Sequence, residues 1–102
     1  MLVLVLGLLA ACTAQTQDQV ARASAKTVVN SILASRFPGV PTAPVTDCVI
    51  DNATAGEILT LGSAALTGVT ASTQSTVTTI LQRRGTINCI ATTGITGVLA
   101  GL

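Results

Sequence analysis

The chain contains no histidine, tryptophan or tyrosine, and phenylalanine occurs once among its 102 residues. Without histidine, it lacks the usual general base of Ser-His-Asp and Cys-His catalysis and the commonest metal ligand. With so few aromatic rings, it is a poor candidate for a module that stacks on sugars or on single-stranded bases. These absences predict a protein that is not an enzyme and that carries no metal or other cofactor.

Charge is also scarce, since Asp, Glu, Lys and Arg make up 9% of the residues and the net charge is +1. A nucleic-acid-binding protein needs a basic face, which this composition does not supply. The hydrophobic core must be built from Val, Ile, Leu and Ala. A chain of this length forms a single domain, and a domain this small is marginally stable without an added cross-link.

The longest hydrophobic run is Leu2 to Ala11. As a helix it would be about 15 Å long, half of the ~30 Å hydrocarbon core of a bilayer. It is therefore too short to span a membrane, but it has the length of the apolar region of a signal peptide. It lacks the basic residues that usually precede such a region, as it would if translation began upstream of Met1.

Leu9-Ala10-Ala11-Cys12 ends this run, and it resembles the lipobox of bacterial lipoproteins in all four positions. The resemblance implies cleavage before Cys12 and attachment of diacylglycerol, and usually an N-acyl chain, to that residue. Several acyl chains suffice for stable membrane anchoring. We therefore expect a signal peptide over residues 1–11, a tether over 12–17 and one helical domain over 18–102.

Two alternatives remain open for the N-terminus. An ordinary signal peptidase could cut near Ala14, which would release an unlipidated secreted protein. Residues 1–11 could also be retained as a short hydrophobic anchor.

With Cys12 assigned to lipidation, two cysteines remain, Cys48 and Cys89. In an exported protein such a pair predicts a disulfide, here closing a loop of about 42 residues. The alternative is a reactive thiol, for which the closest cations in sequence are Arg83 and Arg84. Because Cys89 falls opposite the apolar stripe of the last expected helix, the disulfide predicts that this helix is covered on two faces and lies centrally.

Hydrophobic periodicity indicates helices throughout. The first should run from about Asp18 to Arg36 or Phe37 and end at Pro38-Gly39, since proline cannot continue a helix. Its expected apolar positions are Ala21, Ala25, Val28, Val29, Ile32 and Leu33. A short helix over Val45 to Asp51 should follow, with Pro44 in a first-turn position.

Later helices are marked by their ends. Thr54 and Glu57 form an S/T-x-x-E capping box, which begins a helix that should end near Gly68. Thr70 or Ser72 can cap the next, which should stop at Gly85. Thr86 can cap a last helix whose apolar stripe continues to Leu102. The sequence thus predicts an all-α bundle of four to five short helices closed by the Cys48–Cys89 disulfide.

Three further groups of residues are candidate sites. Asp47 and Asp51 share a helix face and could act as a carboxylate pair, although a solvated face near a helix N-terminus explains them more simply. Arg83-Arg84 would complement the negative end of a helix dipole or contact an acidic partner. The remaining candidate is a G-x-x-x-G pattern at positions 97 and 101, which predicts a close-packing face on a core helix, or else a helix that meets a membrane surface or a partner.

Two segments strengthen the resemblance to lipoproteins, Arg36-Phe37-Pro38-Gly39-Val40-Pro41 and Asp47-Cys48-Val49-Ile50-Asp51-Asn52. With the lipobox, they are similar to segments of small alphaproteobacterial lipoproteins. This resemblance implies a location in the cell envelope, lipid-anchored and facing the periplasm, and it implies no activity.

We therefore expect a non-enzymatic accessory or structural lipoprotein that contacts a protein partner in an envelope complex. The alternative is a carrier, which would need an internal apolar pocket of about 300 Å³ or more. An enzyme would instead require a cleft that holds Asp47, Asp51 or Glu57 with a strongly raised pKa.

Overall fold

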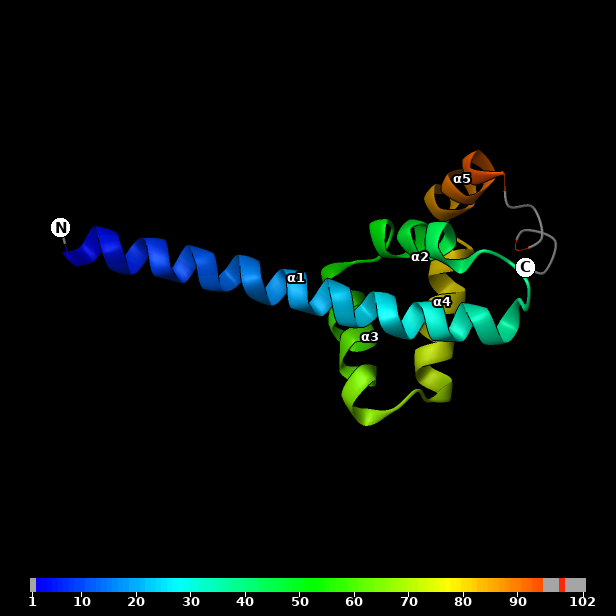
Figure 1. The fold of residues 1–102 in the computed structure, drawn as a ribbon, viewed down its shortest axis with the longest axis horizontal. Coiled ribbons are helices and arrows are strands. Elements are labelled where there is room, and N and C mark those ends of the chain that lie inside the picture. The colour runs from blue at the N-terminus through cyan, green and yellow to red at the C-terminus, as the bar shows by residue number, and fades with distance from the viewer. Residues whose placement is uncertain (1, 95–97, 99–102) are drawn as a thin grey trace.

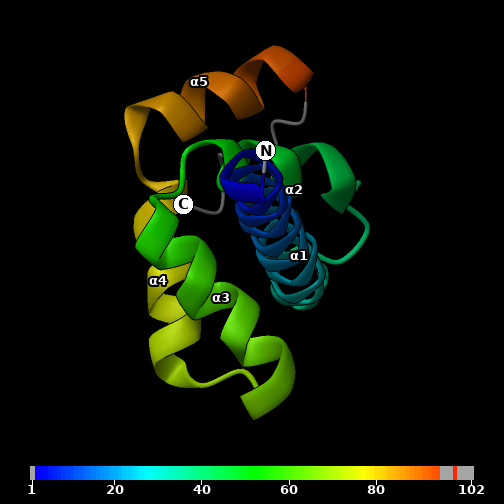
Figure 2. The ribbon, with the colours of Figure 1, turned by 90° about the vertical axis from the view of Figure 1, so that its left-hand side faces the viewer.

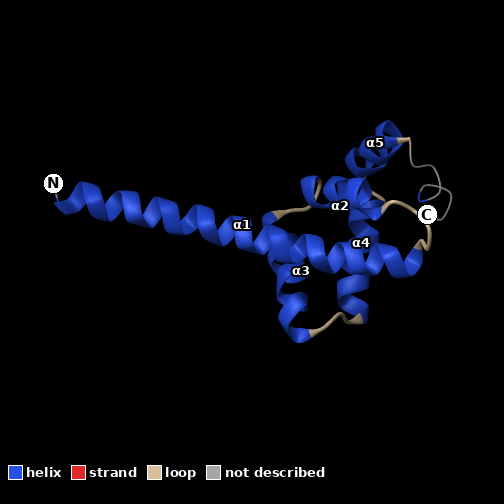
Figure 3. Cartoon of the chain, in the orientation of Figure 1, coloured by secondary structure: helices blue, strands red, loops and turns tan. Residues whose placement is uncertain are grey.

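The computed structural model describes the backbone of residues 2–94 and 98, and the side chains of residues 19–94 and 98. It confirms the all-α prediction, with no strand in the part described (Figures 1 and 3). The five helices are α1 (Leu2–Arg36), α2 (Thr42–Asp51), α3 (Ala55–Thr67), α4 (Ala71–Leu81) and α5 (Arg84–Thr93).

Helix α1 is the longest element, and its N-terminal part extends away from the other four helices (Figure 1). The sequence predicts a helix from about Asp18, preceded by a tether over 12–17, but the helical backbone runs without a break from Leu2. Residues 13–17 are Thr, Ala and Gln, and no Gly or Pro interrupts them. Ala and Gln are good helix formers, so the helix continues through this segment.

The core is aliphatic and is centred on the C-terminal half of α1, which packs against α2 and α3 (Figures 1 and 2). Five of the apolar positions expected on α1 are buried, as the i, i+3, i+4 pattern requires: Ala25, Val28, Val29, Ile32 and Leu33. The other helices contribute fully buried side chains to the same cluster: Val45, Val49 and Ile50 from α2, Leu61 from α3, Val77, Ile80 and Leu81 from α4, and Ile90 from α5.

Proline and glycine follow the end of α1 as expected. The turn after α1 contains Pro38 and Gly39, and Gly39 has a φ of +84°, which a side chain would strain. Helix α2 begins at Thr42 rather than at Val45. Pro44 nevertheless lies in its first turn, where the missing N–H has no intrahelical partner to lose.

The predicted N-terminal caps of α3 and α4 are both present. Thr54 Oγ1 accepts from the Glu57 N–H at 3.2 Å, and Glu57 Oε1 accepts from the Thr54 N–H at 2.8 Å. Thr70 caps α4 in the same reciprocal manner, with Thr73 as its partner. Helix α3 also ends at Gly68, as expected.

The junction between α4 and α5 differs from the sequence-based prediction. Helix α4 ends at Leu81, and Gly85 and Thr86 lie inside α5 rather than serving as a C-terminal stop and an N-terminal cap. Gly85 lies against the Asn52 side chain, whose amide oxygen would have to move aside for a Cβ at this position. Thr86 is fully buried, and its hydroxyl has no hydrogen-bond partner among the residues that the structure describes.

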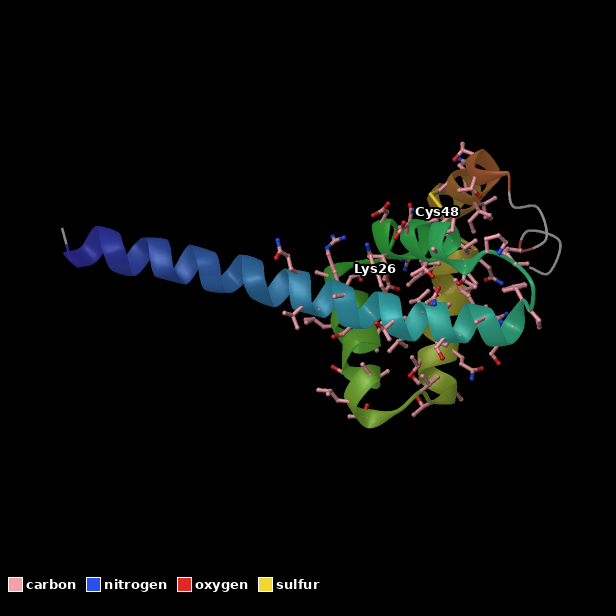
Figure 4. All side chains as sticks on the ribbon, in the orientation of Figure 1. Lys26 and Cys48 are labelled. Carbon is pink, nitrogen blue, oxygen red and sulfur yellow. A yellow bond between two sulfur atoms is a disulfide. The ribbon has the colours of Figure 1, made fainter. Side chains whose placement is uncertain are left out.

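Cys48 and Cys89 form the predicted disulfide, which links α2 to α5 with a Cα–Cα distance of 5.6 Å (Figure 4). The expectation that the last helix lies centrally is wrong. Helix α5 packs against α2 and α4 at the edge of the bundle, because α1 occupies the centre (Figure 1). The G-x-x-x-G pattern at positions 97 and 101 lies outside the described residues.

Only Thr86 and Ile90 are buried within α5. We therefore expect the disulfide to contribute much of the free energy that holds this helix against the rest of the bundle. Replacing both cysteines, Cys48→Ala with Cys89→Ala, should lower the free energy of unfolding by about 4 kcal/mol, the chain-entropy value for this loop. Urea denaturation with and without a thiol reductant measures the effect. The double variant should be insensitive to reductant, and an equal urea midpoint for oxidised and reduced wild-type protein would contradict the prediction.

Candidate functional site

The most distinctive surface feature is a hollow between α1 and α3, which we call the apolar groove. It has a volume of about 330 Å³ and is open to solvent. Its lining consists of Val20, Ala21 and Ser24 from α1, and Leu59, Gly62, Ser63 and Leu66 from α3.

Small residues let the two helices come close together beneath this groove. A Cβ at Gly62 would lie 3.1 Å from the carbonyl oxygen of Ala21, closer than side chains normally approach. Both helices can therefore pack nearly backbone to backbone at this point. The larger apolar residues stand at the rim and are left in water, with 59% of Val20, 62% of Leu59 and 92% of Leu66 exposed. Three large exposed apolar residues around one groove are characteristic of an interaction surface.

A second hollow of about 310 Å³ lies between α1 and α2 and has a polar lining. Asn30 Oδ1 accepts hydrogen bonds there from the hydroxyls of Thr42 and Thr46. Lys26 Nζ lies 3.4 Å from Asp47 Oδ1, and both side chains are mostly exposed (Figure 4). Asp51 is exposed as well, so both aspartates lie on a solvated face. The expectation that they lie near a helix N-terminus is wrong, because α2 begins at Thr42 and ends at Asp51, which places Asp47 in the middle of the helix and Asp51 at its C-terminal end.

A bidentate ion pair joins Arg83 to Glu57. Arg83 Nη1 and Nη2 donate to the two carboxylate oxygens at 2.6 and 2.7 Å, and Nη1 also donates to the Asn52 carbonyl at 2.9 Å. The hydrogen bonds from Arg83 lower the pKa of Glu57 to about 2, against an opposing effect of burial and with help from Thr54. Glu57 therefore stays ionised, whereas a catalytic acid would need a raised pKa.

Sequence patterns do not reveal this ion pair. They predict Arg83 near the C-terminus of a helix, but it lies in the link before α5 and serves as the N-cap residue of that helix. Glu57 is recognisable only through its capping motif. The two residues are 26 positions apart, and no local pattern relates them.

The three cysteines differ in what the structure describes of them. Cys48 and Cys89 are joined in the disulfide. Cys12 belongs to the part of α1 whose side chains are not described, so its lipidation stays a prediction. Within the described residues, no three His, Cys, Asp or Glu side chains gather as metal ligands. None of the described helices combines the length and hydrophobicity needed to cross a bilayer.

No protein-family model matches the chain, and no curated protein or solved structure is significantly similar to it. Any functional proposal must therefore rest on the sequence motifs and on the surfaces described above.

The Glu57–Arg83 pair predicts a specific loss of stability in acid. Because the pKa of Glu57 is lowered from 4.5 to about 2, the folded state gains from its ionisation above pH 4.5 and loses that gain as the pH falls to 2. Glu57→Gln keeps the capping pattern, but its stability should lack the pH-dependent contribution from ionisation of Glu57. Urea denaturation between pH 7 and pH 2 tests the difference between the two proteins.

Asp47→Asn is the matched control, because an exposed ion pair such as that with Lys26 contributes little. Its pH dependence should follow that of the wild type. If the stability of Glu57→Gln had the same pH dependence as that of the wild type, Glu57 would not be responsible for the loss of stability in acid.

The close contact beneath the groove predicts opposite effects for two glycine substitutions in α3. A Cβ added at Gly56 would meet no neighbouring atom within 4 Å, so Gly56→Ala should stabilise the helix by about 0.5–1 kcal/mol. Gly62→Ala would press on the backbone of Ala21 and should leave the protein about 1–2 kcal/mol less stable than Gly56→Ala. Thermal or urea unfolding compares them, and equal stabilisation by both substitutions would show that α1 and α3 are not in close contact.

Proposed function

We propose that the protein is a non-enzymatic lipoprotein of the bacterial cell envelope, anchored through lipid on Cys12 and facing the periplasm. In this proposal it acts as an accessory or structural component and has a protein partner in a membrane or envelope complex. The observation that carries the proposal is the relation between the lipobox and the bundle. Helix α1 leads from the lipobox directly into the core, where Ala25, Val29 and Leu33 are buried.

This arrangement supports anchoring rather than free secretion. A chain cleaved before Cys12 would retain the whole bundle and a short helical lead of about a dozen Å between the lipid and Val20. The disulfide supports an exported location, because disulfides persist in oxidising compartments and are rare in the cytosol.

The non-enzymatic part of the proposal draws on the carboxylates named in the sequence. Glu57 has a lowered pKa and is held by Arg83. Asp47 is exposed and paired with Lys26, and Asp51 is exposed. Acid–base catalysis would need a carboxyl group with a raised pKa, and the pKa of Glu57 is shifted in the opposite direction.

The second candidate is a carrier of an apolar ligand. The apolar groove favours it, because its volume of about 330 Å³ falls in the range of small-molecule sites. However, the groove is open to solvent, whereas such sites usually bury most of the ligand surface. The bundle interior is occupied by fully buried side chains such as Leu33, Leu61 and Leu81. We therefore rank the accessory function first.

The intact mass of the protein extracted from its native membrane tests the proposal. We expect a chain that lacks residues 1–11, carries acyl groups on its first residue, Cys12, and has two hydrogens fewer because of the disulfide. Cys12→Ser should abolish the acyl mass. A native mass that retains residues 1–11 without lipid would refute lipid anchoring, and a ligand recovered with the protein would favour the carrier.

A further inference from the structure

We propose that the apolar groove and its rim residues Val20, Leu59 and Leu66 form a membrane-docking surface that rests on the bilayer. The inference deepens the proposed function, since it concerns the surface next to the proposed anchor. It assigns to the exposed side of α3 a direct contact with lipid.

The groove lies close enough to the anchor to meet the membrane. Val20 is eight residues after Cys12 in the same continuous helix, which places the two backbones about 12 Å apart at 1.5 Å per residue. The polar headgroup layer on each side of a bilayer is roughly 5–8 Å thick. A bundle anchored at Cys12 would therefore carry the groove to the edge of this layer.

The arrangement of α3 turns its exposed side toward the membrane. Helix α3 crosses α1 and lies nearer than α4 to the N-terminal end of the molecule (Figures 1 and 2). With the N-terminal part of α1 pointing into the bilayer, the outer side of α3 faces the lipid and its inner side faces α4. Leu59 and Leu66 are seven positions apart, two helical turns, and so they share one side of α3, the side that lines the groove together with Val20 of α1.

The chemistry of α3 suits an interfacial position. Glu57 is its only charged residue, and Arg83 neutralises it at one end of the helix. The exposed residues of α3 are apolar or carry hydroxyls: Ala55, Gly56, Leu59, Thr60, Ser63, Ala65, Leu66 and Thr67. Burial of such an apolar face at the headgroup boundary is the usual mode of interfacial helices, and no charge on this face would have to leave water.

A bilayer fits this surface better than a partner protein does. Binding energy between proteins is concentrated in Trp, Tyr and Arg, while Leu, Ser, Thr and Val are under-represented among the dominant residues. The groove is lined by Leu, Ser, Val, Ala and Gly alone. A lipid surface requires only apolar area and imposes no matching geometry.

The test uses the processed chain, residues 12–102, carrying Cys12→Ser, so that neither attached lipid nor the apolar run Leu2 to Ala11 contributes to binding. Its partition onto vesicles of phosphatidylethanolamine and phosphatidylglycerol is measured by co-sedimentation. Replacing both leucines, Leu59→Ser with Leu66→Ser, should lower the partition coefficient by about tenfold or more, since burying one exposed leucine is worth about that factor. Both leucines are largely exposed, so the fold should persist.

Val69→Ser is the matched control. Val69 is also an exposed apolar residue, at 44%, but it lies in the link after α3 and does not line the groove. Its partition should equal that of the parent chain. Equal losses for both variants, or no loss for the leucine variant, would overturn the proposal.

A second readout locates the contact. An environment-sensitive fluorophore on Leu66→Cys should shift to the blue when vesicles are added, whereas the same dye on Ser35→Cys, at the far end of α1, should stay in water. If the dye at position 66 stays in water, the proposal that this surface docks on a bilayer is wrong, and a partner protein is the remaining occupant. Because no lipid is attached in these chains, failure here is separate from failure of the mass measurement on Cys12.

Discussion

Close approach of helices is the constraint on which this small bundle depends, because a single phenylalanine is available to fill space between them. Aliphatic side chains reach less far than rings, so α1 and α3 must come together at small residues. Ala21 and Gly62 provide that contact. The same constraint produces the apolar groove, since small residues form its floor while Leu59 and Leu66 remain at its rim. The feature that permits packing thus also creates the main surface available for binding.

Helix α5 is attached differently, because few of its residues enter the core. The disulfide links it to α2, and Arg83 links its N-terminus to Glu57 and to the Asn52 carbonyl. Glu57 serves two purposes, since its carboxylate also completes the cap of α3. Two covalent or charged links therefore replace the apolar contacts that a longer or more central helix would make. This accounts for a disulfide in a domain whose other helices are held by packing.

Sequence patterns predicted the local features and missed the relations between distant segments. The buried face of α1, the caps at Thr54 and Thr70 and the end of α3 at Gly68 follow from short-range rules, and each is present. Gly85 was misinterpreted because it lies inside α5, against the side chain of Asn52, 33 positions earlier, rather than at a helix end. The Glu57–Arg83 pair and the groove likewise exist only once α3 is packed against other elements. The disulfide could be predicted because its argument needs only a cysteine count and a compartment.

The disulfide and the exposed leucines relate to two different parts of the proposed location: the disulfide to export, and the leucines to attachment at a membrane. A disulfide indicates an oxidising compartment, which an anchored protein and a freely secreted one would share. Free secretion offers no reason to keep Leu59 and Leu66 in water beside an apolar groove, and such surfaces favour aggregation unless they are covered. Under the proposed anchoring at Cys12, the bilayer would cover these leucines, because α1 would bring this face toward it. Helices α2 and α5 lie on the other side of α1 from α3, and in this arrangement they would face away from the bilayer (Figures 1 and 2).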